Sequence, residues 1–237
     1  MYRQLEPQRI TATARRLAQR VGERFPDSGL SRVSLELCAL SEASERRAAD
    51  LRRSDWRVRA GIAAGLLLIF VVALWTLVQA VRGLTLASSV ADFFQGLDAA
   101  INEIVLLGLG VFFLITIESR LKRRAALRAL DELRSIAHII DMHQLTKDPE
   151  HVIGSASKTP SSPARTMTRT DLTRYLDYCS ELLSITSKLA ALHVQSLSDP
   201  VVLDAVNGIQ ALTVGLSGKI WQKIMILDAI AAPSERS

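Results

Sequence analysis

The feature that most constrains this chain is an apolar run from Ala60 to Val81, which holds no charged residue and a single amide, Gln79. At about 1.5 Å per residue, a helix over this run is about 33 Å long. That length is enough to cross a hydrocarbon core of about 30 Å. We therefore predict a transmembrane helix over residues 60–81.

A second and weaker apolar run extends from Ala99 to Ile117. As a helix it covers about 28 Å, which is just enough to cross a bilayer. We predict a second transmembrane helix over residues 99–117, although Asn102 and Glu103 lie in its first turns. Because the uninterrupted apolar part, Ile104–Ile117, is short, a re-entrant or buried helix is the alternative.

Residues 82–98, between the two runs, predict a short connection. Ser88 or Ser89 is placed to cap a short helix there. One face of this helix would be apolar, which predicts a helix lying at the membrane interface. The residues that share this face are Val90, Phe93, Phe94 and Leu97.

The charges on either side of the two runs predict the orientation in the membrane. The connection carries one basic residue, Arg82, against Asp92 and Asp98, whereas both flanking segments are strongly basic. The flanking basic residues are Arg52, Arg53, Arg57 and Arg59, then Arg120, Lys122, Arg123, Arg124 and Arg128. By the positive-inside rule, both termini face the cytoplasm and the connection faces outward. A bacterial inner membrane fits best, and a mitochondrial inner membrane fits less well because Glu6 and Glu23 argue against a presequence.

Residues 1–59 predict N-terminal cytosolic amphipathic helices. Apolar residues recur at steps of three and four from Ile10 to Phe25, and Pro7 is well placed to start a helix. We favour a helix that packs on the rest of the cytosolic domain over a basic helix that lies on an anionic membrane surface. The turn Phe25–Gly29 should end this helix, and a second helix should then lead to the membrane.

The remainder of the chain divides into three segments. Residues 118–152 predict a helical rod that continues from the second span, with an apolar face suited to coiled-coil contacts. Residues 153–169 have the Ser, Thr and Pro content of a flexible linker. Residues 170–237 predict a helical hairpin, with its boundary at Ser198–Pro200. Charged and amide residues interrupt the last helix, which we therefore predict to be amphipathic and not a third span.

The predicted fold class is an all-α integral membrane protein. A two-span transmembrane hairpin would carry a cytosolic helical bundle that is built from the N- and C-terminal segments. Gly61 and Gly65, at the spacing GxxxG, would let two helix backbones approach closely, and Gly108 and Gly110 offer a matching patch. This packing could occur within one chain or between chains.

Polar and basic residues near the spans are candidate sites. Gln79, Asn102 and Glu103 would fall near the outer interface, where we expect mainly wet helix ends and, as the alternative, a polar vestibule. Candidates for contact with anionic lipid headgroups are Arg9, Arg16, Arg20, Arg52, Arg53, Lys122, Arg123 and Arg124. This clustering beside the membrane also explains the net charge of +5 better than nucleic-acid binding does.

The sequence contains no catalytic or cofactor-binding motif of the common classes. The densest polar cluster holds His138, Asp141, His143 and His151, but their spacing does not bring them to one helix face. We therefore predict no catalytic residue, cofactor or metal site, and read the histidines as capping or surface residues. Cys38 and Cys179 have no metal or disulfide spacing and are expected to be reduced.

These features predict a non-catalytic inner-membrane anchor or scaffold. Its cytosolic helices would mediate homo-oligomerisation or bind a cytosolic protein partner, and could couple a signal from membrane to cytosol. One alternative is a subunit of a small homo-oligomeric channel or transporter, although the connection lacks the Gly-Met-Asn motif of the common two-span magnesium channels. Another is a membrane-bound enzyme that uses the region of His138, Asp141 and His143.

Overall fold

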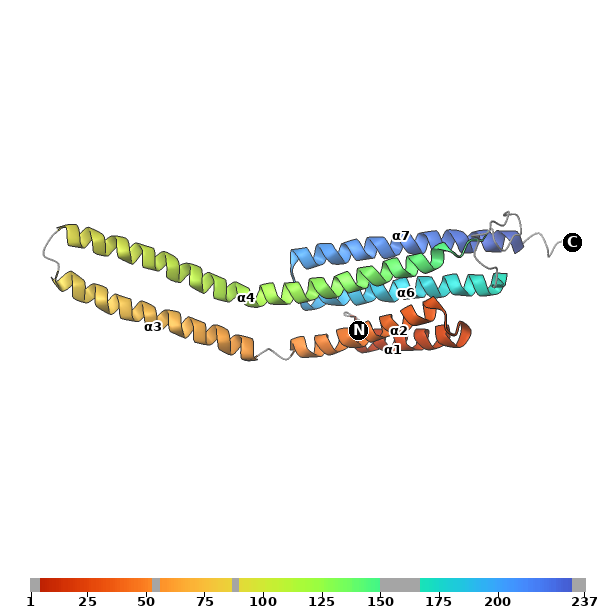
Figure 1. Cartoon of the computed structure of the whole chain (residues 1–237), viewed down its shortest axis with the longest axis horizontal. Coiled ribbons are helices and arrows are strands. Elements are labelled where there is room, and N and C mark those ends of the chain that lie inside the picture. The colour runs from red at the N-terminus through yellow and green to blue at the C-terminus, as the bar shows by residue number, and fades with distance from the viewer. Residues whose placement is uncertain (1–4, 53–55, 87–89, 150–166, 232–237) are drawn as a thin grey trace. The chain divides into compact units, whose positions relative to one another are not determined.

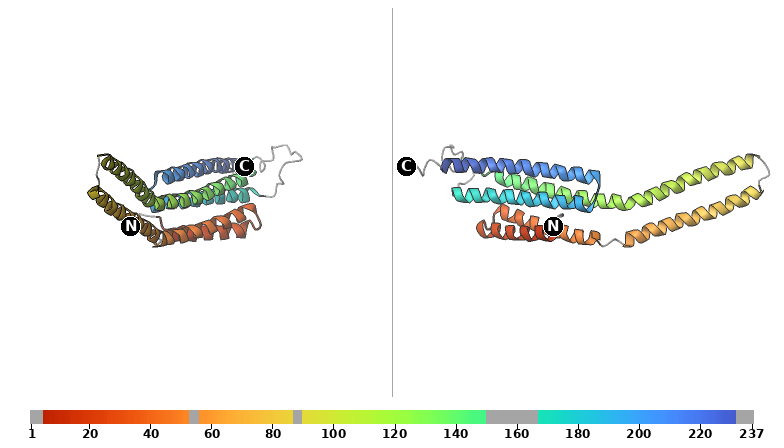
Figure 2. Two further views of the ribbon diagram at one scale, coloured as in Figure 1. Left: turned by 60° about the vertical axis from the view of Figure 1, so that its left-hand side comes forward. Right: turned by 180° about the vertical axis from the view of Figure 1, so that it is seen from behind.

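The computed structural model describes residues 5–52, 56–86, 90–149 and 167–231. Every regular element in these ranges is an α-helix and none is a strand, which confirms the all-helical prediction. The helices fall into two units, each of which is compact (Figures 1 and 2). Unit 1 comprises Met1–Arg52 and Ala125–Ser237, and unit 2 comprises Arg53–Arg124.

The N-terminal part of unit 1 is a hairpin of α1 (Pro7–Arg24) and α2 (Gly29–Arg52). Pro7 starts α1, where its missing N–H costs nothing. In the turn, Asp27 adopts a left-handed φ of 59°, a conformation that Asp tolerates better than most residues. The side chain of Ser28 then accepts a hydrogen bond from the Ser31 N–H and caps α2.

The C-terminal part of unit 1 pairs α6 (Arg169–Ser196) with α7 (Pro200–Ala231). Thr168 caps α6 by accepting from the Asp171 N–H. Asp199 caps α7 in the same way, with Pro200 at the helix start. The connection between the two helices is short, so α7 returns antiparallel along α6 (Figure 1).

The core of unit 1 takes side chains from α1, α2, α6, α7 and the C-terminal part of α4 (Val90–Leu145). The apolar faces expected for α1 and for the rod are buried in it. The largest fully buried side chains are Leu17, Leu30, Leu37, Leu130, Leu133, Ile140, Leu176, Leu182, Leu183, Leu189, Ile209 and Ile220. Burial of one such side chain is worth about 1.5–3 kcal/mol, so this shared core is what holds the five helices together.

Unit 2 consists of α3 (Trp56–Leu86) and the first part of α4. The prediction of a separate short interfacial helix in the connection is wrong. The residues expected to form it are the first turns of α4, which begins at Val90 and continues unbroken through the second apolar run to Leu145. Between Val90 and Ala99 only Gly96 disfavours helix, at a cost of about 1 kcal/mol, and no proline interrupts the chain. The expected continuity from the second run into the rod is present.

Among the described residues, three helices are long and apolar enough to cross a membrane. The ranges are Ala60–Gln79 in α3, Gly96–Leu145 in α4 and Pro200–Ala229 in α7, and the most apolar 18-residue windows within them have mean hydropathies of 2.6, 2.2 and 1.3. The third was expected to be only amphipathic. It reaches this length and hydropathy because apolar residues also occupy part of the face of α7 that points away from the core.

Candidate functional site

The most distinctive chemical feature of unit 2 is the large number of apolar side chains on its outer surface. Large apolar side chains are exposed along both helices, including Phe70 at 64%, Trp75 at 63%, Ile104 at 70% and Leu106 at 69%. Within the part of the chain that the structure describes, no residue in the most apolar 18-residue window of α3 or of α4 is buried. A surface of this kind is costly in water and matches the chemistry of lipid chains.

The two helices of unit 2 meet at glycines. A Cβ added at Gly65 on α3 would lie 3.0 Å from Leu114 Cδ1 on α4. In the reciprocal contact, a Cβ at Gly110 on α4 would lie 3.3 Å from Ile69 Cδ1 on α3. Each glycine therefore receives an aliphatic side chain from the other helix, as small-residue packing requires.

The other two predicted packing glycines are placed differently. An added Cβ at Gly61 or at Gly108 would meet nothing within 4 Å. Of the four glycines, Gly65 and Gly110 therefore take part in packing within this chain, and Gly61 and Gly108 face open space.

Hydroxyls within the apolar helices are satisfied locally. Thr76 donates to the carbonyls of Val72 and Ala73, and Thr116 donates to those of Phe112 and Phe113. Such hydrogen bonds remove the cost of an unsatisfied polar group in lipid.

The three vestibule candidates are not brought together. Gln79 and Asn102 are exposed and Glu103 is half-buried. Among the described residues, the structure gives none of the three a hydrogen bond to another.

The basic residues proposed to touch lipid headgroups have mixed surroundings. In unit 1, Arg9 pairs with Glu6 at 2.5 Å, Arg16 is exposed, and Arg20 pairs with Glu181 and lies 5.6 Å from the centre of the Tyr178 ring. In unit 2, Lys122 pairs with Glu118 at 2.6 Å, Arg123 is half-buried and Arg124 is exposed. The side chain of Arg52 and the whole of Arg53 lie outside the described residues.

The apolar face of α1 is not available to a membrane. Ile10, Ala14, Leu17 and Val21 are all buried in the core of unit 1. This result agrees with the packing interpretation of α1 and is incompatible with insertion of the same face into lipid.

The histidine cluster does not form a site. His138 is exposed, Asp141 accepts a hydrogen bond from Gln144 Nε2, and His151 lies outside the described residues. No group of three or more potential ligands is arranged to hold a metal ion within the part of the chain that the structure describes.

His143 instead closes the contact between α4 and α2. A Cβ added at Gly29 would lie 2.1 Å from His143 Cε1, so the imidazole rests directly on the backbone at the start of α2. Burial lowers the pKa of His143 below its ordinary value of 6.5, and the nearby charges of Arg32 and Lys147 lower it further. The neutral imidazole is therefore the form that fits this position.

The C-terminus of α4 is capped by a lysine from another helix, which the sequence did not reveal. Lys223 Nζ on α7 donates to the carbonyls of Gln144, at 2.9 Å, and Lys147, at 3.4 Å. A cation at this helix end also complements the helix dipole. Lys147 Nζ in turn lies 5.2 Å from the centre of the Tyr175 ring on α6.

The two cysteines are free thiols. Cys179 is fully buried, and burial raises the pKa of its thiol to about 12. Burial, together with the charge of Glu42, also raises the pKa of Cys38. Both thiols are thus held in their unreactive, protonated form at neutral pH.

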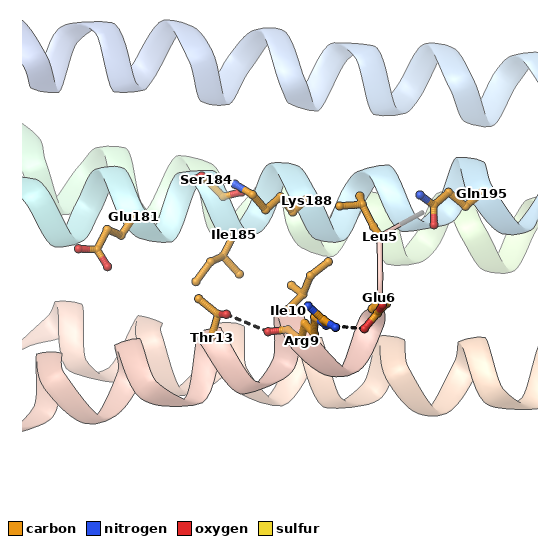
Figure 3. Close-up of a pocket in the computed structure, with 10 residues that line it drawn as sticks. All are labelled: Leu5, Glu6, Arg9, Ile10, Thr13, Glu181, Ser184, Ile185, Lys188 and Gln195. Carbon is orange, nitrogen blue, oxygen red and sulfur yellow. Dashed lines mark hydrogen bonds and ion pairs between the residues drawn. The ribbon is translucent and has the colours of Figure 1, made fainter. Parts of the chain in front are cut away.

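An open groove of about 590 Å³ lies between the start of α1 and α6 (Figure 3). Two of its charged side chains form an ion pair, and a third has a neutral partner. Glu6 pairs with Arg9, and Lys188 Nζ donates to Ser184 Oγ at 2.5 Å. The ion pair offsets the charges of Glu6 and Arg9, whereas the Ser184 hydroxyl gives Lys188 a hydrogen-bond partner without offsetting its charge.

No protein-family model, curated protein or solved structure is significantly similar to this chain. The functional inference therefore depends on the geometry and chemistry of the chain itself.

Proposed function

We propose that this protein is a non-catalytic membrane anchor, in which a two-span hairpin carries a cytosolic helical scaffold. The observation that carries the proposal is the contrast between the two units. Unit 1 buries a shared core of aliphatic side chains, whereas the described residues in the most apolar 18-residue windows of α3 and α4 are all at least partly exposed. Unit 2 has the composition of a structure solvated by lipid.

The pairing of α3 with α4 supports one hairpin per chain. The contacts of Gly65 with Leu114 and of Gly110 with Ile69 lie along the two apolar helices. In lipid, where the hydrophobic effect does not drive helices together, close packing of this kind is the main source of association.

Charge supports the proposed orientation. The segments before α3 and after the second apolar run are rich in arginine and lysine, and the connection carries only Arg82. The proposal therefore places both termini in the cytoplasm of a bacterium, with the connection outside. The basic flanks would also attract anionic lipid headgroups.

The proposal keeps α7 out of the membrane. One face of α7 is in the core of unit 1, through residues such as Val206, Ile209 and Ile220. Lys223 reaches from α7 to the end of α4. Crossing the membrane would forfeit this burial and would place Lys223 in lipid, at a cost of about 2.5–3.5 kcal/mol near the bilayer centre.

The proposed role of unit 1 is to bind other proteins, including further copies of the chain. Its sequence offers no motif for catalysis. The apolar face of α1 is used inside the protein, so the binding surface would lie on other helices.

Extraction of membranes with alkaline carbonate tests the anchor. We expect the full chain to stay in the membrane pellet. The double variant Leu68→Arg/Val71→Arg, near the middle of α3, should shift into the soluble or degraded fraction, because each arginine costs about 2.5–3.5 kcal/mol at the centre of a span.

The control is the pair Leu203→Arg/Val214→Arg in α7, two residues that are 45% and 71% exposed. This control should remain in the pellet. Release of the unmodified chain by carbonate would refute the anchor, and loss of only the α7 variant from the pellet would show that α7 is the membrane helix.

A further inference from the structure

The groove between the start of α1 and α6 has an apolar floor (Figure 3). Ile10 on α1 and Ile185 on α6 are both buried where they line it, and Leu5, just before α1, is half-buried. The rest of the lining is polar or charged. A concave surface of about 590 Å³ with this composition resembles a small-molecule site, which typically measures about 300–1,000 Å³.

The walls of the groove are held in place at both ends. At one end, Arg20 on α1 donates to Glu181 on α6. At the other end, the amide of Gln195 pairs with the backbone of Leu5 when it is oriented to satisfy both of its groups. It then accepts from the Leu5 N–H at 2.9 Å and donates to the Leu5 carbonyl at 3.3 Å. The groove is therefore formed before a ligand arrives, which lowers the entropic cost of binding.

One positive charge in the groove has no negative partner. The two glutamates that line the groove are each paired with an arginine. Lys188 forms no ion pair with any acidic residue that the structure describes, and its ammonium donates to Ser184 Oγ at 2.5 Å. The groove therefore presents one uncompensated positive charge beside an apolar floor.

Ser184 places a second donor next to this charge. A hydroxyl can accept and donate at the same time, so the Ser184 O–H can still donate while its oxygen accepts from Lys188. Both side chains are exposed. A carboxylate can accept from the two donors together, with one oxygen on each, and hydrogen bonds to a charged group are the strong ones.

We propose that this groove binds a carboxylate that carries a single alkyl chain, such as a medium-chain fatty acid. The carboxylate accepts from Lys188 and Ser184, and the alkyl chain lies over the aliphatic floor. Lys188 is halfway between Glu181 and Gln195 along α6, so about 10 Å of groove extends on either side of it. That length suits a chain of medium length.

The charges also select against other amphiphiles. One uncompensated lysine matches a monoanion, whereas the two glutamates of the lining would repel the second charge of a phosphate monoester. One row of aliphatic side chains fits one alkyl chain and not the two chains of a phospholipid. The proposed site goes beyond the proposed anchor and does not depend on it.

Photolabelling of the full chain tests the site. The chain is reconstituted in vesicles of phosphatidylcholine, at a mildly alkaline pH, and irradiated with decanoate that bears a diazirine near the end of its chain. We expect label on residues 5–13 and 181–195, located by mass spectrometry of the peptides. Unlabelled decanoate should compete. Decan-1-ol, which lacks the charge, and acetate, which lacks the chain, should compete about tenfold less well.

Substitution of the lysine tests the charge. Lys188→Met should lower labelling of the groove about tenfold, because it removes a charge-assisted hydrogen bond and keeps most of the side-chain volume. Lys188→Glu should reverse the preference, so that a decylammonium probe labels the groove in place of decanoate. The matched control is Lys219→Met, an exposed lysine on α7 that does not line the groove. It should label like the parent, and circular dichroism should show equal helical content in all variants.

Equal labelling of the parent and of Lys188→Met would overturn the proposal, and so would equal competition by decanol and decanoate. Label confined to α3 and α4 would show that the probe meets only the surface that faces lipid, which also refutes the site. If phosphatidylglycerol in the vesicles competed as well as decanoate, a phospholipid headgroup would be the occupant instead. Carbonate extraction reports anchoring separately, so an empty groove and a failed anchor give different results.

Discussion

At the residue scale, the helices of unit 1 are fixed in place by a few contacts between distant parts of the chain. His143 rests on Gly29, and Lys223 caps the end of α4. Phe25 packs edge-on against Tyr175 with ring centres 5.4 Å apart. These contacts join α1, α2, α4, α6 and α7 near one end of unit 1, and the bonds from Lys223 also satisfy carbonyls at the end of α4 that the helix itself leaves free.

Gly29→Ala should destabilise unit 1 by about 1–3 kcal/mol, because the new methyl group would overlap the His143 ring. The measurement is denaturant unfolding of the purified chain, followed by the helical signal. Gly22→Ala is the matched control in the same hairpin. Its Cβ would meet Ser31 Oγ at an ordinary 3.6 Å, so the control should be neutral or stabilised by about 0.4–1 kcal/mol. Equal effects of the two substitutions would contradict the contact.

The lowered pKa of His143 predicts a pH dependence of stability. In the unfolded chain the imidazole takes up a proton near its ordinary value of 6.5, whereas the folded protein resists protonation until a lower pH. The unfolded state therefore binds more protons in this window, and stability should fall as the pH drops from above 6.5 through the folded pKa.

Unfolding measured at several pH values between neutral and mildly acidic checks this expectation. His143→Gln should flatten the pH dependence, and His138→Gln, at an exposed position on the same helix, should leave it unchanged. An unaltered slope in the His143 variant would rule out this residue as the source.

At the element scale, helix positions followed from periodicity, but contacts between helices did not. The repeat from Ile10 to Phe25 identified the buried face of α1 correctly, since a 3.6-residue period is a local property. The roles of His143 and Lys223 depend on residues far away in the sequence, and no spacing within one helix reveals them.

The sequence predicted neither the start of α4 in the connection nor which glycines lie in contact. A short helix was expected near the interface because serines precede Val90, but capping potential does not end the helix that follows, and α4 runs on. The four glycines looked equivalent. Only the rotation of α3 against α4 distinguishes Gly65 and Gly110, which are in contact, from Gly61 and Gly108, which are not.

The glycine contacts predict that Gly65→Leu separates α3 from α4, because the larger side chain would occupy the space of Leu114. The measurement uses a chain that carries both Ile69→Cys and Gly110→Cys. When Gly65→Leu is added, the yield of the intrachain cross-link between these two cysteines in membranes should fall severalfold. The control Gly61→Leu, where an added Cβ meets nothing within 4 Å, should retain the cross-link. Loss of the cross-link in both variants would argue against specific packing at Gly65.

At the scale of the whole molecule, the chain divides its apolar residues between two different solvents. Unit 1 excludes water from a core that is built by segments on both sides of unit 2 in the sequence. Unit 2 turns its apolar residues outward. This division explains how a chain that is 49% hydrophobic has both a buried core and a large exposed apolar surface.

The central claim is a two-span anchor with both termini on the same side, and residue labelling tests it most directly. Single cysteines are placed at Tyr2, Ser89 and Ser234 in a chain whose Cys38 and Cys179 are replaced by alanine. A membrane-impermeant maleimide is then applied to intact spheroplasts. We predict labelling of Ser89→Cys alone, with Tyr2→Cys and Ser234→Cys labelled only after permeabilisation. Labelling of Ser234→Cys from outside, as a third span through α7 would require, would contradict the account.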